Sequence, residues 1–331
     1  MGVPGPVPER STRIDLRGGA HRVPLRPRTG PGGPMKVFLA GGTGFIGGHL
    51  LEGFLARGHE ITALIRPSTR PRPARAGLTW LHGEWLAPES WLPTLAGHQA
   101  IVHAVGLIRE RGAATFEAVQ AEAPIRLHAA AQDLGVRNFI QVSALGAQEG
   151  ATTRFLRTKL AADQNLAQSG LRHLILRPSF VYGPGDHSMA FFERLAHLPI
   201  VPLPEGGWMR IQPLHVQDLV RATLTWAEND QPDGIFDLGG GEALSFREVL
   251  SRLRGKPLRS MTIPGWAMDL GARSTDLLGR GPITRDELRM LRSGSVCDNG
   301  PFIQAFGFEP LPFSRGLALR NTPTGARHGH L

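Results

Sequence analysis

Cysteine, lysine and tyrosine are scarce in this chain of 331 residues, of which 41% are hydrophobic and 20% are charged. The single cysteine, Cys297, excludes an internal disulfide and fits a reducing compartment. Lysine occurs only at Lys36, Lys159 and Lys256, so arginine supplies nearly all of the basic charge. The one tyrosine is Tyr182. Because these residue types are so few, the position of each bears on function.

Long apolar segments are also missing. The longest useful stretch without a charged residue, 90–108, contains Pro93, Gly97 and two histidines, which a membrane-spanning helix would not carry. The N-terminus lacks the apolar core of a secretory signal. We therefore expect a cytoplasmic protein, and the alternative is a protein attached peripherally to the inner membrane.

The net charge of +9 raises the question of nucleic-acid binding. The arginines are spread along the chain, and no zinc-finger spacing, aromatic RNA-binding strand or basic helix occurs. We therefore expect no nucleic acid among the partners, and we retain weak attraction to an anionic membrane surface as an option.

Composition divides the chain into unequal parts. Residues 1–34 are rich in proline, glycine and arginine, so we expect a disordered extension, with a targeting peptide as the competing interpretation. Met35 directly precedes the first expected strand and is a candidate start of translation. The expected remainder is a nucleotide-binding domain over 35–240, a small lobe over 241–318 that includes parts of 179–212, and a disordered tail over 319–331.

The stretch 37–58, VFLAGGTGFIGGHLLEGFLARG, organises the rest of the chain. A short apolar run leads into three glycines, and apolar residues then recur with helical spacing. A buried strand, a glycine-rich turn and a helix are typical of the first half of a dinucleotide-binding unit, in which free amides and the helix dipole bind the phosphates. The residues expected to bind the cofactor here are Gly41, Thr43, Gly44, Phe45, Ile46 and Gly47.

Further short apolar segments alternate with helical ones. The expected strands cover 60–65, 78–81, 100–104, 138–142 and 171–176, with 235–238 as a further strand. This alternation indicates right-handed crossovers. It predicts an α/β fold, a doubly wound parallel sheet of the Rossmann type. The small C-terminal lobe is expected over the carboxyl edge of the sheet, where a substrate would bind.

Arginines follow the second expected strand, beginning with Arg66 and continuing at Arg70, Arg72 and Arg75. The adenosine ribose lies at this point in such folds, where an acidic residue binds the 2′-hydroxyl and an arginine accommodates a 2′-phosphate. The pattern therefore favours NADP(H) over NAD(H) as the cofactor, and a solvated loop is the alternative. Glu84, after the third strand, is expected beside the adenine.

Several segments resemble the short-chain dehydrogenase/reductase superfamily, in its extended and atypical, epimerase/dehydratase-like branches. The likeness covers residues 35–317 and includes GGTGFIGGHL, the segment from AVQAEAP to VSALGA, RTKLAADQNLAQSG, RPSFVYGPGD and IQPLHVQDLVRA. Within the superfamily the chain is most similar to the nucleotide-binding accessory subunit of respiratory complex I and its bacterial relatives. The resemblance implies an NAD(P)-binding Rossmann domain of the oxidoreductase type.

The resemblance also implies a place for each catalytic group. Active members use a tyrosine and a lysine four residues apart on one helix, so that the ammonium lowers the pKa of the phenol, together with a serine or threonine after the fifth strand. Here Lys159 matches the lysine and Ser143 lies near the serine position, but Phe155 occupies the tyrosine position, and a phenyl ring cannot transfer a proton. Lys159 keeps a second family role, binding the nicotinamide ribose. Further cofactor contacts are implied at Ala104, Val105, Gly106, Pro178 and Ser179.

Other side chains could replace the missing tyrosine. His187 and His215 fall near the expected cleft as surrogate acids or bases, with packed or solvated histidines as the alternative. Tyr182 is expected on the loop after the sixth strand. Glu110 and Arg111 are most simply a solvated loop. The histidines show no metal-ligand spacing, so we expect no metal site.

Two hypotheses for function follow, with a third derived from the first. The first is a non-catalytic or weakly catalytic NADPH-binding protein that supports a respiratory or quinone-related assembly; in the third, occupancy by NADP(H) signals to a partner. The second is an active reductase, epimerase or dehydratase on a small carbonyl, sugar-nucleotide or lipid-like substrate. Trp266 is expected in the core, with contact to a membrane or a partner subunit as the alternative. The sequence identifies neither the substrate nor the oligomeric state.

Overall fold

The structure, a computed structural model, describes residues 33–70, 72–278 and 284–320. The expected extension over 1–34 and the tail over 319–331 lie almost wholly outside these residues. Among the helices of the described residues, none is long and apolar enough to cross a membrane.

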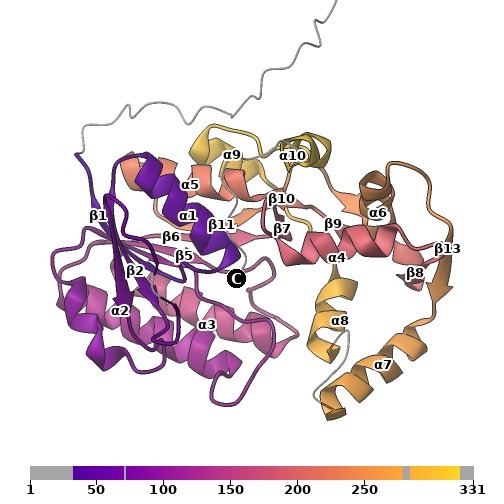
Figure 1. Ribbon diagram of the computed structural model, residues 1–331, viewed down its shortest axis with the longest axis horizontal. Helices are drawn as coiled ribbons and strands as arrows, with labels where there is room; N and C mark the ends of the chain where they lie inside the picture. The colour runs from indigo at the N-terminus through magenta and orange to yellow at the C-terminus, as the bar shows by residue number, and fades with distance from the viewer. Residues whose placement is uncertain (1–32, 71, 279–283, 321–331) are drawn as a thin grey trace, which may run out of the picture.

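A seven-stranded parallel sheet forms the centre of the molecule, in the order β11-β6-β5-β4-β1-β2-β3 (Figure 1). The order reverses between β1 and β4, and ligands of such sheets bind in the crevice at this switch point. The predicted doubly wound sheet is confirmed. Its strands are β1 (Lys36–Ala40), β2 (Glu60–Ile65), β3 (Leu78–His82), β4 (Ala100–His103), β5 (Asn138–Val142), β6 (Arg172–Pro178) and β11 (Gly234–Leu238).

Helices cover both faces of the sheet, so the central strands β1 and β4 are buried at every position except Lys36. In Figure 1, α1 (Phe45–Ala56) and α5 (Val216–Glu228) lie above the sheet, and α2 (Ala123–Asp133) and α3 (Arg154–Gln168) lie below it. A π-helical turn, η3 (Ala118–Glu122), leads into α2, and the short helical turns η1 (Pro88–Ser90) and η2 (Leu92–Leu95) precede β4. Each face therefore has its own hydrophobic core.

The remaining elements build a lobe with a third hydrophobic core. Its helices α6 and α8 both begin with a capping box, at Ser245 and at Thr284. α9 instead packs on β11 and α5 of the main domain. The elements are β7 (Val181–Tyr182), α4 (His187–Ala196), β8 (Val201–Pro204), η4 (Glu205–Gly207), β9 (Arg210–Ile211), β10 (Leu214–His215), β12 (Leu244–Ser245), α6 (Phe246–Arg254), β13 (Ser260–Ile263), α7 (Gly265–Leu278), α8 (Arg285–Ser293), α9 (Gly300–Phe306) and α10 (Phe313–Arg320).

Tyr182 joins the end of the chain to the lobe. Sequence reasoning placed it on a loop, but it lies in β7 and is completely buried. Its hydroxyl donates a hydrogen bond to the carbonyl of Phe313 at 3.3 Å, and its ring packs edge-on against Phe313 and His215. Gly316 of α10 leaves room for this hydroxyl, because a Cβ at that position would lie 1.8 Å from it.

We expect Gly316→Ala to destabilise the protein by about 1–3 kcal/mol, because the added methyl group displaces a rigid, buried ring. Gly271→Ala in α7 is the matched control. A Cβ there meets nothing within 4 Å, so the change should be neutral or stabilise by up to about 1 kcal/mol. Urea unfolding measures both values, and equal free energies of unfolding for the two variants would contradict the packing described.

Candidate functional site

The glycine loop lies at the switch point of the sheet, where two of its glycines are required by close packing. Gly41 has φ +93°, and a Cβ on it would lie 2.7 Å from the carbonyl oxygen of Ala104. A Cβ on Gly47 would lie 2.0 Å from the carbonyl oxygen of Gly41. The glycines thus bring α1 and the end of β4 against the turn, as a pyrophosphate cradle requires.

The first turn of α1 is open to a ligand. Gly44 is the N-cap and has no side chain to accept the first amides of the helix, and Thr43 and Gly44 are both exposed. Free amides and the positive end of a helix dipole suit a phosphate group. The residues present therefore fit a dinucleotide, with Phe45 and Ile46 half-buried behind the turn.

Lys159 lies where the carboxyl ends of β4 and β5 meet. Its Nζ is 3.2 Å from the carbonyl oxygen of Val142 and 3.5 Å from that of Val105, and a Cβ on Gly106 would come within 3.5 Å of it. The residue is only 6% exposed. Burial lowers the pKa of Lys159 to about 8, although the Asp163 carboxylate opposes the shift. The lysine therefore points at the strand ends that the cofactor is expected to cross.

Gln120 fixes the loop that follows β4, and sequence reasoning missed it. Its side-chain carbonyl accepts the amide of Leu107 at 3.2 Å, and its amide donates to the Thr158 hydroxyl at 3.2 Å. Gln120 is completely buried within the π-helical turn η3. Such turns often mark functional sites, but no sequence pattern distinguishes this one.

Asp163, one turn after Lys159, is the centre of a buried polar network. Its carboxylate accepts hydrogen bonds of 2.8 Å each from Ser143 Oγ, Gln141 Nε2 and Arg177 Nε. Burial raises the pKa of Asp163, and the contact with Arg177 opposes that rise. The hydroxyl of Ser143 thus donates its proton to a structural carboxylate. A catalytic role for Ser143 stays a prediction and would require this hydrogen bond to change.

Phe155 lies one helical turn before Lys159, at the position expected for a catalytic tyrosine. Its ring packs edge-on against Phe116, with the ring centroids 5.9 Å apart. Two apolar rings therefore occupy the region in which a proton donor would be needed.

The candidate surrogate bases do not meet at the site. His215 is completely buried, its Nδ1 accepts the amide of Gln217 as the N-cap of α5, and burial lowers its pKa to about 4. The expectation of His215 as an accessible acid or base is therefore wrong, and the packed alternative holds. His187 is exposed at the start of α4.

The ends of β4 and β6 flank the same crevice. Ala104 and Val105 are half-buried next to the glycine loop, and Gly106 is exposed. Pro178 ends β6, and the hydroxyl of Ser179 donates a hydrogen bond to the carbonyl of Gln212. Cofactor contacts for these residues stay predictions.

The arginines after β2 fall into two groups. Arg72 lies over the ring of Trp80 at 5.2 Å, and Arg75 forms a two-point ion pair with Glu52. Arg66 is exposed at the end of β2 and forms no ion pair with another described residue. Only part of the predicted arginine cluster is therefore available to a 2′-phosphate.

The segment after β3 is packed rather than open. Glu84 is exposed, and its carbonyl accepts a hydrogen bond from the indole of Trp91 at 2.8 Å. Trp85 stacks between Trp91 and His103, with ring centroids 5.8 and 5.2 Å away. Contact of Glu84 with the adenine stays a prediction.

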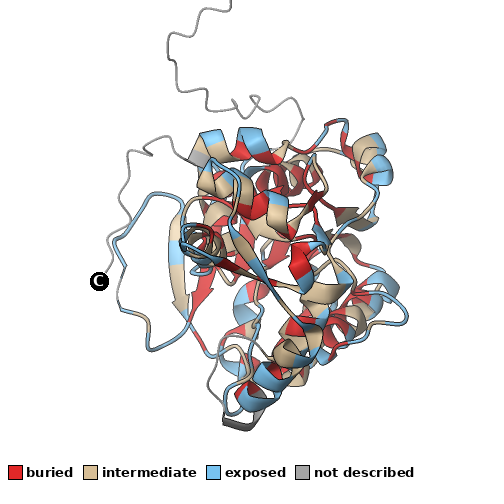
Figure 2. Cartoon of the chain, turned by 90° about the vertical axis from the view of Figure 1, so that its right-hand side faces the viewer, coloured by how far each residue is buried: buried red, intermediate tan, exposed pale blue. Residues whose placement is uncertain are grey.

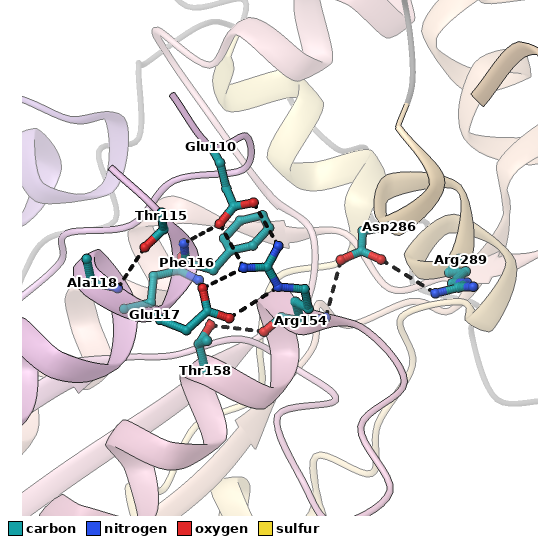
Figure 3. A network of polar contacts seen from close by, with 10 residues as sticks. Glu110, Thr115, Phe116, Glu117, Ala118, Arg154, Thr158, Asp286 and Arg289 are labelled. Carbon is teal, nitrogen blue, oxygen red and sulfur yellow. Dashed lines mark hydrogen bonds and ion pairs between the residues drawn. The ribbon is translucent and has the colours of Figure 1, made fainter. Parts of the chain in front are cut away.

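Helix α8 crosses from the lobe to the main domain (Figure 3). The Arg154 guanidinium pairs with Glu110 at 3.0 Å and with Glu117 at 2.7 Å, and its amide donates to Asp286 of α8 at 3.2 Å. The expectation of Glu110 as part of a solvated loop is therefore wrong, because its partner comes from α3, far along the chain.

A second contact strengthens this crossing. Arg109 forms a two-point ion pair with Glu287 of α8 at 3.0 and 2.9 Å. Burial alone would raise the pKa of Glu287, but hydrogen bonds from Arg109 and from Thr284 lower it overall. The segment that follows β4 is thus attached to the lobe on one side and, through Gln120, to α3 on the other.

A pocket of about 670 Å³ lies between loop 145–152, β11 and residues 293–298. Arg177, Asp237 and Cys297 are among the residues that line it, whereas the glycine loop and Lys159 do not. Burial raises the pKa of Cys297 to about 11, so its thiol stays protonated near neutral pH. The pocket is therefore separate from the expected cofactor crevice.

Comparison with known proteins agrees with the geometry. The model of a family described as NAD(P)H-binding matches residues 41–190. A ceramide reductase of Caulobacter vibrioides is 28% identical over 55% of this chain, and the match spans 57% of that protein's own length.

Two further relatives cover more of this chain. A complex I protein of Arabidopsis thaliana, NADH dehydrogenase [ubiquinone] 1 alpha subcomplex subunit 9, is 25% identical over 67% of this chain and 59% of its own. The photosystem II assembly factor Ycf39 of Synechocystis is 28% identical over 83% of this chain and 86% of its own.

Solved structures share the fold. MoeE5, in complex with UDP-glucuronic acid and NAD, superposes with a TM-score of 0.66 over 86% of this chain and 97% of its own, at 23% identity. At this identity the likeness concerns the fold alone.

We expect the stability of the protein to depend on Lys159 in alkaline solution. Its pKa of about 8 lies below the ordinary 10.5, so between these values the unfolded chain binds a proton that the folded protein has released. Stability due to this group therefore rises with pH across that window, by up to about 3 kcal/mol. The free energy of unfolding of the wild type should increase relative to Lys159→Met, which lacks the titration. Cys297 titrates in both proteins and cancels in the difference, and parallel pH curves would contradict the burial described.

The matched family region contains the glycine loop, Lys159 and the strands from β4 to β6. The same residues form the crevice at the switch point. Residues 41–190 therefore match an NAD(P)H-binding family, and the chain is similar to a complex I subunit and to a photosystem II assembly factor.

Proposed function

We propose that the protein binds NADPH at the switch point of its sheet and is non-catalytic or weakly catalytic. One observation carries the proposal. Lys159 is in place beside Gly106, whereas the tyrosine position holds a phenyl ring and the nearby candidate proton donors are committed elsewhere. Ser143 donates to Asp163, and His215 is buried as a helix cap.

Different residues of the site would bind different parts of the cofactor. A bound nicotinamide would supply hydride transfer. The amides of the glycine loop bind the pyrophosphate, and the Lys159 ammonium donates to the ribose hydroxyls. Loss of a positioned proton donor lowers the rate of such reactions by about 10²–10⁴-fold. Binding without rapid turnover is the result.

The preference for NADPH rests on Arg66. Its guanidinium follows β2, where the adenosine ribose is expected, and it forms no ion pair with another described residue. A planar guanidinium recognises a phosphate through two parallel hydrogen bonds. The proposal therefore places the 2′-phosphate at Arg66.

We further propose that the bound nucleotide stabilises the fold, and that the stabilised protein supports a respiratory or quinone-related assembly. A ligand that binds only the folded state stabilises it in proportion to the logarithm of its concentration over Kd. Two relatives have names that refer to assemblies, complex I and photosystem II. A role in which nucleotide occupancy signals to such a partner follows from the same site.

The alternative function is an active reductase, epimerase or dehydratase. The lowered pKa of Lys159, about 8, favours it, because such an ammonium can release a proton near neutral pH. The paired rings of Phe116 and Phe155 would favour a lipid-like or small carbonyl substrate over a sugar nucleotide. A ceramide reductase is among the relatives.

We expect Arg66→Asp to lower the ratio of NADPH to NADH affinity by about 10- to 100-fold, because it removes a charged hydrogen-bond donor to the 2′-phosphate. Titration of nucleotide fluorescence measures both affinities. Arg72→Asp is the matched control, because the Arg72 guanidinium lies over the ring of Trp80. The ratio of NADPH to NADH affinity in this variant should stay close to that of the wild type. An unchanged ratio in Arg66→Asp would refute the assignment.

Phe155→Tyr tests the missing proton donor. The new phenol would lie one turn from the Lys159 ammonium, which lowers a phenol's pKa. We expect NADPH oxidation against a panel of aldehydes, diketones and quinones to rise by about 10²–10⁴-fold over the wild type. The double variant Phe155→Tyr/Lys159→Met should lose the gain. Rapid oxidation by the wild type, with no gain from the tyrosine, would favour the active-enzyme alternative.

A further inference from the structure

We propose that the outer end of the C-terminal lobe is a docking face for an anionic lipid bilayer. Figure 1 shows β8, β13 and α7 together at the end of the molecule opposite β1–β3. The docking face is defined by four apolar residues and three basic ones: Ile200, Met261, Trp266 and Leu270, with Lys256, Arg259 and Arg273.

The β8–β13 ribbon presents one side outward. The parallel register places Val201 opposite Ser260, and Val201 and Leu203 are buried in the core of the lobe. Side chains alternate along a strand, so the residues next to these face the other way. Met261, opposite Pro202, and Ile200, just before β8, are therefore expected on the outward face.

Helix α7 begins one residue after the β8–β13 ribbon ends. Ala272 and Thr275 are its buried positions. Trp266, Leu270 and Arg273 follow the i, i+4, i+7 spacing of one exposed stripe on the opposite side of the helix. The helix is thus amphipathic, but its large apolar side chains lie on the side that faces solvent.

Four large apolar residues of these elements are exposed, and the expectation of Trp266 in the core is therefore wrong. Ile200, Met261, Trp266 and Leu270 are 57%, 56%, 72% and 60% exposed. Figure 2 looks onto this end of the molecule and shows exposed stretches on the elements that face the viewer. Single exposed apolar residues are ordinary, but four large ones on adjoining elements mark an interaction surface.

The charge around the patch is positive. Lys256, Arg259 and Arg273 are exposed, and none forms an ion pair with another described residue. Of the two acidic residues of α7, Asp269 and Asp276, Asp269 is already paired with Arg292 at 2.8 Å. An anionic surface would therefore meet the exposed positive charges of Lys256 and Arg259 at this end of the lobe.

This combination favours lipid over a protein partner. Tryptophan and aliphatic side chains flanked by lysine and arginine are typical of helices that lie in the membrane interface. Each basic residue near an anionic bilayer strengthens binding by about fivefold. The proposal does not depend on cofactor binding, because no residue of the docking face contributes to the crevice at the switch point.

The test is flotation of the full chain with phosphatidylcholine vesicles, with and without phosphatidylglycerol. Trp266→Ser/Leu270→Ser removes apolar contacts, and Lys256→Glu/Arg259→Glu reverses charge. The control, Leu134→Ser/Arg137→Glu, makes the same kinds of change at exposed residues after α2. NADPH titration of every variant checks that the fold and the proposed cofactor site are unaffected.

We expect the wild type and the control to bind only vesicles that contain phosphatidylglycerol, and to release at high salt. The apolar variant should bind at least about 10-fold more weakly, and the charge variant at least about 25-fold more weakly. Absence of wild-type binding would overturn the proposal. Equal binding by all variants would also overturn it, because attraction through the basic N-terminal segment would then suffice. A wild-type dimer that Trp266→Ser/Leu270→Ser converts to a monomer would assign the face to a second copy of the chain instead.

Discussion

The burial of the Lys159 ammonium at the meeting point of two strand ends is the constraint on which the site depends. An amine this deeply enclosed needs acceptors, and the carbonyls of Val105 and Val142 supply them only if β4 and β5 end side by side. Gly106 lies beside the ammonium, and a Cβ there would lie 3.5 Å from Nζ. The pKa of the lysine, lowered to about 8, shows that the cost of burying its charge outweighs these favourable interactions.

Helix α3 links this site to the rest of the molecule. Arg154 contacts α8 of the lobe, Phe155 contributes an apolar ring, Lys159 faces the crevice and Asp163 anchors the network under β5 and β6. Positions 155, 159 and 163 follow the helical repeat, so one face of one helix carries them. In the proposed function, the Phe155 side chain is the local change that separates cofactor binding from proton transfer.

The centre of the sheet was predictable because β1, β2 and β4 are mostly buried apolar runs bounded by glycine or polar residues. β2 and β5 end where the sequence indicated, and the glycine loop was evident from its spacing. Contacts between distant segments were not predictable. Arg109 and Glu287 lie 178 residues apart, and the partner of Arg177 depends on how α3 packs against β6. The burial of His215 likewise follows from the position of α10, which no local pattern reveals.

The proposed function combines an intact nucleotide-binding crevice with the absence of a proton donor, so one experiment should test both features. The emission of NADPH bound to the purified protein can be followed over time after addition of mixed aldehydes, diketones and quinones. We predict enhanced emission on binding, which then remains constant. No enhancement would contradict the intact crevice, and a rapid decay that Lys159→Ala abolishes would contradict the loss of catalysis.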